Sequence, residues 1–176
     1  MNDTGVVNNL YLKLSREHEI VLNFFAPAAK LLKAKKFHEL FELLKRTEKD
    51  LSQHIQRHFH FEEEVFFPAV LLENASIDSV RLVLKLQKEH GMIERDLRQV
   101  YQIIHSPIML PEEKQREVLS LYRDLNRDVR RHARTEIQTL FPLLDQGERG
   151  RIQTFVSESF KRLETNTGLP VPITER

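Results

Sequence analysis

Two stretches of the sequence carry histidine and glutamate at a spacing suited to metal binding. In each, a His is followed by Glu at the fourth position, Phe at the ninth and Pro at the tenth, and the second copy lies 74 residues after the first. The copies are His58-Phe-His-Phe-Glu62-Glu-Glu-Val-Phe-Phe67-Pro68 and His132-Ala-Arg-Thr-Glu136-Ile-Gln-Thr-Leu-Phe141-Pro142. Residues four apart on a helix share one face and lie about 6 Å apart along the axis, so each His can share a site with its Glu.

A second histidine precedes each copy. Glu17-His18 lies 40 residues before His58, and Glu89-His90 lies 42 residues before His132. The chain therefore consists of two copies of one unit that carries His, then His, then Glu. An internal repeat of this kind predicts the architecture as well as the site.

The elements that position these residues are amphipathic helices. Apolar residues recur at three- and four-residue steps, which predicts helices over about residues 10–32, 37–72, 78–105 and 111–144. We expect Pro27 to interrupt or kink the first helix, and Asn74 to Ser76 to mark the break before the third. The apolar faces of the second and fourth helices should continue past the glutamates to Leu72 and Leu143.

Four such helices with short connections predict an all-α fold, an antiparallel up-and-down four-helix bundle. A short additional C-terminal helix is expected over about residues 152–163, followed by a loose tail from Asn166. We expect residues 1–146 to form the bundle, and residues 147–176 to form a C-terminal helix and tail that pack on it or extend from it.

Each bundle helix places a His about halfway along its apolar face, so six polar groups would converge on one buried layer. They are His18, His58, Glu62, His90, His132 and Glu136. Unpaired buried carboxylates cost several kcal/mol each, and no Lys or Arg lies on these faces, so a dication is the natural partner. Four imidazoles and two carboxylates exceed the four ligands of an ordinary zinc site. They suit two first-row metals about 3.5–4 Å apart with the carboxylates bridging, and the mixed nitrogen and oxygen donors favour iron, with manganese or zinc as alternatives.

The paired His-x-x-x-Glu-x-x-x-x-Phe-Pro motifs resemble those of the hemerythrin-like family, the HHE cation-binding domain, over roughly Tyr11 to Leu144. This resemblance implies a four-helix bundle that holds a non-haem di-iron centre, with two Fe ions joined by an oxo or hydroxo bridge. It also implies that the six residues named above are the metal ligands.

Two positions depart from the oxygen-carrying hemerythrins. Those proteins have a second His four residues after the His of the third helix and an Asp five residues after the His of the fourth. This chain has Glu94 and Ile137 there, and its carboxylate is Glu136. The lost imidazole argues against reversible oxygen storage and favours binding or sensing of a small diatomic, O2 or NO.

The pattern is closer to bacterial relatives associated with sensing these gases or with repair of damaged iron-sulfur centres. The alternative function is therefore a di-iron redox enzyme acting on peroxide or another small substrate, or an iron donor in iron-sulfur centre repair. No general base outside the ligand set identifies a substrate pocket, so the sequence leaves open whether the chain is an enzyme.

Three further polar residues are candidates for the surroundings of the site. Glu94, one turn after His90, is interpreted either as another carboxylate at the metals or as a solvated rim residue. His54 is a candidate metal ligand or pocket histidine, and Asp128 is a candidate acceptor of a hydrogen bond from His132. The alternative for both is ordinary packing or solvation. His38 and His60 are expected on the surface, and His105 is expected to lie too far from the site to reach the metals. Tyr11 and Tyr101 are expected in core packing, and Phe67 and Phe141 are expected to cap the ligand helices or pack the bundle.

Composition excludes several classes of protein. The 176 residues include no cysteine, which rules out disulfides, thiolate ligands and iron-sulfur clusters. The net charge of +1 arises from 27 basic and 26 acidic residues that are scattered along the chain, so no nucleic-acid partner is expected. The longest uncharged run is too short to cross a membrane, and no signal-peptide pattern begins the sequence. We expect a cytoplasmic protein, with the C-terminal helix as a possible surface for a protein partner or for self-association.

Overall fold

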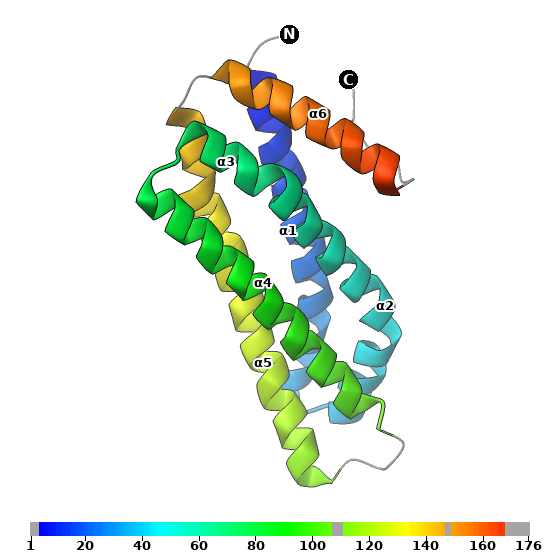
Figure 1. The fold of residues 1–176 in the computed structure, drawn as a ribbon. Helices are drawn as coiled ribbons and strands as arrows, with labels where there is room; N and C mark the ends of the chain where they lie inside the picture. The colour runs from blue at the N-terminus through cyan, green and yellow to red at the C-terminus, as the bar shows by residue number, and fades with distance from the viewer. Residues whose placement is uncertain (1–3, 107–110, 147–148, 168–176) are drawn as a thin grey trace.

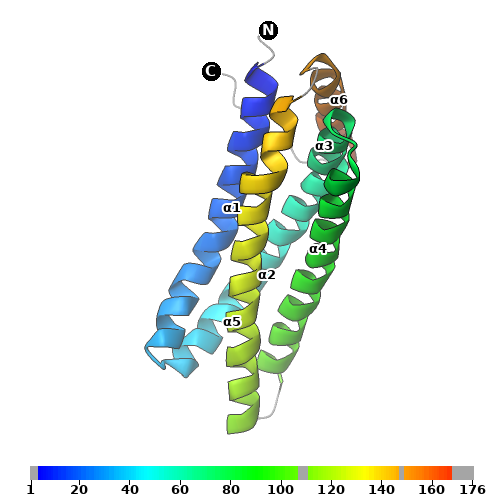
Figure 2. The same cartoon turned by 90° about the vertical axis from the view of Figure 1, so that its left-hand side faces the viewer.

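The computed structural model describes residues 4–106, 111–146 and 149–167. Four helical stretches run alternately up and down side by side, and a further helix lies across one end (Figures 1 and 2). The bundle stretches are α1 (Thr4–Lys33); α2 (Phe37–Phe61), η1 (Glu62–Phe66) and α3 (Phe67–Glu73); α4 (Ile77–Ile104); and α5 (Glu112–Thr135), η2 (Glu136–Leu140) and η3 (Phe141–Gln146). The crossing helix is α6 (Arg149–Thr167). The predicted all-α up-and-down bundle with an additional C-terminal helix is confirmed.

The helix boundaries follow from local chemistry. Ser76 caps α4, where its side chain accepts a hydrogen bond from the backbone N–H of Ser79. Lys35, with φ of 58°, takes the left-handed conformation that turns the chain from α1 into α2. The predicted interruption at Pro27 is wrong, because α1 runs through it without a break. Most of the expected C-terminal tail lies outside the described residues.

The two halves of the repeat each contain a π-helical turn, and each turn begins at the motif Glu. The backbone N–H of Phe67 donates to the carbonyl of Glu62, and that of Phe141 donates to the carbonyl of Glu136, five residues back in each case. The next residue in both copies is a proline, which has no N–H and whose ring would clash with the carbonyl four residues earlier in an α-helix. A π turn inserts one residue and so accommodates the proline at the cost of a shift in register.

This shift corrects two expectations about the core. Leu72 is 50% exposed, whereas Val70 is fully buried. In the second copy, Leu143 is only partly buried while Leu144 is fully buried. The α-helical period used to predict Leu72 and Leu143 as core residues does not hold across a π turn, because the extra residue rotates all that follows by about 100°.

Two apolar clusters fill the bundle, one on each side of the histidine layer. The cluster away from α6 includes Phe25, Leu51 and Tyr122, and the cluster towards α6 includes Leu14, Phe66 and Leu140. α6 contributes Ile152 and Val156 to the second cluster, so it packs on the bundle with its apolar face covered. In the described part of the chain, every helix is too short or too polar to cross a bilayer.

Candidate metal centre

The four helical stretches bring the six predicted ligands into one buried layer. α1, α2, α4 and α5 each supply one His, and the first residues of η1 and η2 supply the two glutamates. Each of these six residues is at most 5% exposed: His18, His58, Glu62, His90, His132 and Glu136. All six therefore lie where the sequence predicted, between the two apolar clusters.

The imidazoles form two pairs, each from one copy of the repeat. His18 and His58 form the first half-site, with ring centroids 4.6 Å apart and planes at 83°. His90 and His132 form the second half-site, with centroids 4.7 Å apart and planes at 67°. The similar geometry shows that the internal repeat has become an approximate two-fold symmetry of the site.

Glu62 lies between the half-sites and contacts both. Its Oε1 is 2.9 Å from Nε2 of His58 and 3.5 Å from that of His18. Its Oε2 is 3.1 Å from Nε2 of His90 and 3.9 Å from that of His132. One oxygen therefore faces each half-site, which is the arrangement of a carboxylate that bridges two metal ions.

Glu136 divides its oxygens in the same way. Its Oε2 is 2.9 Å from Nε2 of His18, and its Oε1 is 3.4 Å from Nε2 of His132. Two four-residue groups that could hold a metal ion result, one from the first half-site and one from the second, and both contain Glu62 and Glu136.

The ligand atoms of this layer are arranged to bind cations, because several of them lack hydrogen-bond partners among the described residues. Four donor atoms are buried without a hydrogen-bond partner in the described part of the chain: both oxygens of Glu62, Oε1 of Glu136 and Nε2 of His58. Within the described residues, neither carboxylate pairs with a Lys or Arg. The Nε2 atoms of His90 and His132 are 3.0 Å apart, and two nitrogens about 2.1 Å from a shared metal and at right angles to it have roughly this separation. The residues present therefore fit two metal ions.

The electrostatics of the metal-free site also favour the binding of cations. Burial opposes protonation of His58, but the charge of Glu62 and the hydrogen bond to Glu17 raise its pKa to about 10. Burial likewise opposes protonation of His132, but Glu136, Glu62 and Glu89 raise its pKa to about 9. Without metal, the carboxylates are thus neutralised by protons on imidazoles, and a bound cation would displace these protons.

The two central carboxyl groups respond differently to this crowding. Burial would raise the pKa of Glu62, yet the charge of His58 and the closeness of the imidazoles of His132 and His18 hold it well below the ordinary value. For Glu136, burial and the negative charge of Glu62 together raise the pKa. Glu62 therefore carries the negative charge at the middle of the layer, and Glu136 protonates before it.

A second layer of carboxylates contacts the outer nitrogens of three imidazoles. Nδ1 of His58 donates to Glu17 at 3.1 Å, Nδ1 of His132 donates to Glu89 at 3.1 Å, and Nδ1 of His90 donates to Glu63 at 2.7 Å. Such contacts orient an imidazole and direct its Nε2 towards a metal. The sequence analysis did not assign this role to these residues, although the repeated Glu-His dipeptides at 17–18 and 89–90 were a signal for two of them.

The other candidate residues lie outside the ligand groups. Asp128 pairs with Arg127 and Arg131, so the prediction that it accepts from His132 is wrong and Glu89 takes that role. Glu94 is a partly exposed rim residue 3.5 Å from Arg98, and the ring of His54 packs against Phe24.

The remaining predicted residues divide as follows. His38 and His60 are exposed as expected, and His105, which was expected to lie away from the metals, is exposed at the end of α4. Tyr101 is buried as expected, whereas Tyr11 is 40% exposed and packs edge-on against Phe141. The prediction of a core position for Tyr11 is therefore wrong. Leu10 and Leu14 form the buried face of α1, and Tyr11 lies outside that face.

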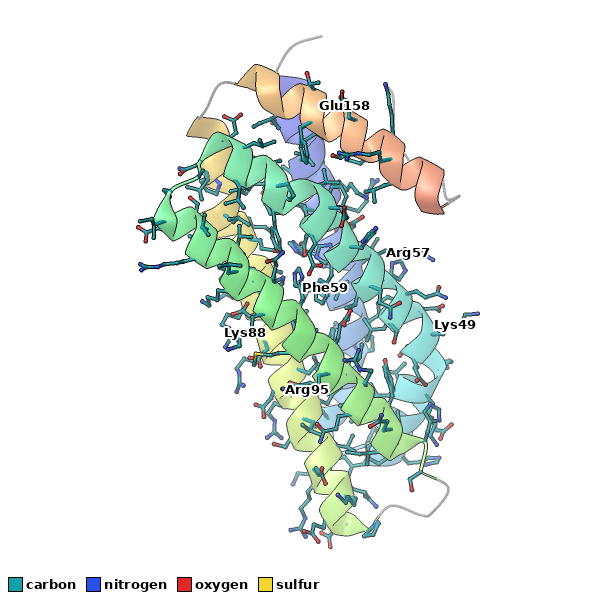
Figure 3. All side chains as sticks on the ribbon, viewed as in Figure 1. Lys49, Arg57, Phe59, Lys88, Arg95 and Glu158 are labelled. Carbon is teal, nitrogen blue, oxygen red and sulfur yellow. The ribbon has the colours of Figure 1, made fainter. Side chains whose placement is uncertain are left out.

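Aromatic rings pack against the second half-site. Phe59 stacks on His90 with centroids 3.8 Å apart and planes at 9°, and Phe67 is also nearly parallel to this imidazole at 5.5 Å. Figure 3 labels Phe59 inside the bundle, with Arg57 and Lys88 on its outside. These rings hold His90 in place and exclude water from it.

An apolar pocket lies beside the imidazoles of His18, His58 and His132. Its other walls are aliphatic side chains and Phe59. Ala133, which lines this pocket, occupies the position in the second copy of the repeat that Phe59 occupies in the first. The smaller residue leaves space next to the layer of ligands, which a small uncharged molecule could enter.

Comparison with known proteins agrees with this geometry. The family model described as the hemerythrin HHE cation-binding domain matches residues 9–149, a range that contains all six residues of the buried layer. The curated proteins and the solved structures give no match. With most of its length matched and its buried His and Glu groups arranged to hold metal, the chain belongs to the hemerythrin HHE cation-binding domain family.

Proposed function

We propose that this protein holds two iron ions in the buried layer and uses them to bind or sense a small diatomic, O2 or NO. The observation that carries the proposal is the set of unpaired carboxylate oxygens of Glu62 and Glu136, which face four imidazole Nε2 atoms with no Lys or Arg partner in the described residues. Bound iron would supply redox and ligand-binding chemistry at this point. The family assignment and the mixed nitrogen and oxygen donors favour iron over manganese or zinc.

The residues in and around the layer would have different roles in metal binding. His18 and His58 would hold one ion and His90 and His132 the other, while Glu62 and Glu136 would each contribute an oxygen to both. Glu17, Glu63 and Glu89 orient imidazoles through their Nδ1 atoms. The apolar clusters exclude water from the layer.

The apolar pocket favours a small uncharged ligand. Its aliphatic walls offer no hydrogen-bonding groups apart from the imidazoles, so an ionic or strongly polar substrate would lose hydration without compensation. O2 and NO are small and weakly hydrated. This character supports binding or sensing over a redox enzyme that acts on peroxide, which is polar, and over an iron donor, which would need a path for a larger partner.

Metal content tests the proposal. Elemental analysis of protein purified without chelators should give about two irons per chain, and the reduced protein should develop a new absorption band on exposure to NO. A single zinc per chain, or two irons that give no spectral response to O2 or NO, would contradict the proposal.

A further inference from the structure

The two half-sites contain the same ligand types but differ behind the imidazoles. Nδ1 of His58, His90 and His132 each donates to a carboxylate. Nδ1 of His18 is buried and has no hydrogen-bond partner among the residues that the structure describes. An unsatisfied buried N–H is unusual, and metal-binding histidines almost always have an acceptor at the outer nitrogen.

One difference between the two copies of the repeat accounts for this asymmetry. Glu63 follows Glu62 in η1 and reaches across to His90 in the other half-site. The equivalent residue after Glu136 in η2 is Ile137, and the equivalent of His90 is His18. Where approximate symmetry would put an acceptor for His18, the chain therefore has an aliphatic side chain.

A carboxylate that accepts a hydrogen bond from Nδ1 makes Nε2 of the same imidazole a stronger electron-pair donor to a metal. It also adds negative charge near the cation. Loss of such a partner typically lowers metal affinity by about 10- to 100-fold. The second half-site has this support at both imidazoles, through Glu63 and Glu89, and the first half-site has it only at His58, through Glu17.

We infer that Glu63 makes the half-site of His90 and His132 the tighter of the two, so that metal fills it first and the half-site of His18 and His58 exchanges its metal more readily. Glu63 is a positioning residue here, since it acts through His90. The inference rests on the proposed two-metal centre and adds an order of loading to it.

Competition titration of the full chain with Zn2+ tests this order. The metal-free protein is titrated in the presence of a chromophoric chelator, and the affinities of the two binding steps are fitted separately. Two identical sites would also bind stepwise, because the first cation repels the second, so the decisive result is the response to substitution. Glu63→Gln should weaken the first, tight step by about 10- to 100-fold and leave the second step nearly unchanged.

Two further variants and two backgrounds that each lack one ligand make the comparison specific. Glu64→Gln removes the same charge from an adjacent, exposed position of η1 and should change neither step. Ile137→Glu supplies the missing acceptor and should strengthen the second step. In a His18→Ala background, only the half-site of His90 and His132 should bind Zn2+, and Glu63→Gln should still weaken this binding. In a His90→Ala background, only the half-site of His18 and His58 should bind Zn2+, and Glu63→Gln should have no effect.

The possible outcomes separate the two proposals. If Glu63→Gln has no more effect than Glu64→Gln, or weakens both steps equally, the loading order is wrong while the two-metal centre stands. If saturating Zn2+ gives fewer than two ions per chain, the centre itself is wrong. If circular dichroism shows that the metal-free chain is unfolded, the titration is replaced by extraction of metal from the loaded protein with a chelator. The wild-type protein should then lose one ion well before the other, whereas the Glu63→Gln variant should lose both together.

Discussion

At the scale of single residues, the two central carboxylates are not equivalent. Glu62 lies within 3.9 Å of Nε2 of all four imidazoles. Among the imidazoles of the described residues, Glu136 comes this close only to those of His18 and His132. Glu62→Ala should therefore remove both ions and lower the metal content from two to near zero. His132→Ala should mainly empty the second half-site and leave about one ion per chain.

Elemental analysis after gel filtration distinguishes these outcomes. His60→Ala is the matched control, since His60 is an exposed histidine only two residues from Glu62 and should retain both ions. Equal metal loss in Glu62→Ala and His132→Ala would contradict a bridging role for Glu62.

The pocket makes a second prediction at this scale. Ala133→Leu should fill the space beside the imidazoles, because the pocket has little spare volume for three added carbons. Binding of NO to the reduced protein, followed by its absorption band, should weaken by at least tenfold while the metal content stays at two. Undiminished NO binding in a variant that keeps both ions would mean that the ligand reaches the metals by another route.

The site residues differ in how well the sequence could reveal them. The positions of the six central groups in the buried layer could be predicted because they form three pairs, and the repeat puts the two members of each pair at matching depth in an apolar face. Glu63 could not, because its counterpart is Ile137 and a single Glu beside a ligand is indistinguishable from a solvated one. Asp128 was predicted from spacing along its own helix, whereas the acceptor for His132 comes from α4, a neighbour that spacing does not reveal.

At the scale of elements, the π turns η1 and η2 set which residues face the core beyond the glutamates. Val70→Ala should lower the free energy of unfolding by roughly 2 kcal/mol, because Val70 is fully buried after the register shift. Leu72→Ala should change it by less than about 0.5 kcal/mol, because Leu72 is half exposed.

Chemical denaturation of the metal-loaded variants measures both effects. The two substitutions control for each other, since an uninterrupted α-helix through residue 72 would make Leu72 the core residue and reverse the order. A larger loss for Leu72→Ala would thus be inconsistent with the π turn.

The π turns explain why helix boundaries and types were easier to predict than register. Hydrophobic periodicity fixes the phase of a helix only while the period stays at 3.6 residues, and Leu51, Ile55 and Val65 follow that phase. The Phe-Pro pair after each motif was visible in the sequence, but its effect on the turn before it depends on packing. The fold class did not depend on that detail, so it could be predicted while Leu72 and Leu143 could not.

At the scale of the whole molecule, the histidine layer joins two otherwise separate apolar clusters. The layer is the only break in the core of the described residues that is filled by charged groups, so its state of charge affects the entire bundle. Bound metal, or protons in its absence, must neutralise Glu62 and Glu136 for the helices to stay together. Fold stability and metal occupancy are therefore linked.

This linkage gives the metal-free protein a distinct pH dependence. Its raised pKa values, about 10 for His58 and about 9 for His132, exceed the ordinary value of about 6.5. Protonated imidazoles thus stabilise the fold fully below about pH 6.5, and this contribution is lost as the pH rises through the raised values. The Tm of the metal-free protein should fall by several degrees between about pH 7 and 9.5, below the range in which tyrosines titrate.

The metal-loaded protein provides the control for this prediction. In the proposed centre each Nε2 would bind metal and would have no proton to lose, so the Tm of the loaded protein should stay level over the same interval. Thermal unfolding followed by circular dichroism in both forms gives the comparison. A level Tm in the metal-free form would mean that protons do not replace the cations in the layer, and that Glu62 and Glu136 are neutralised in some other way.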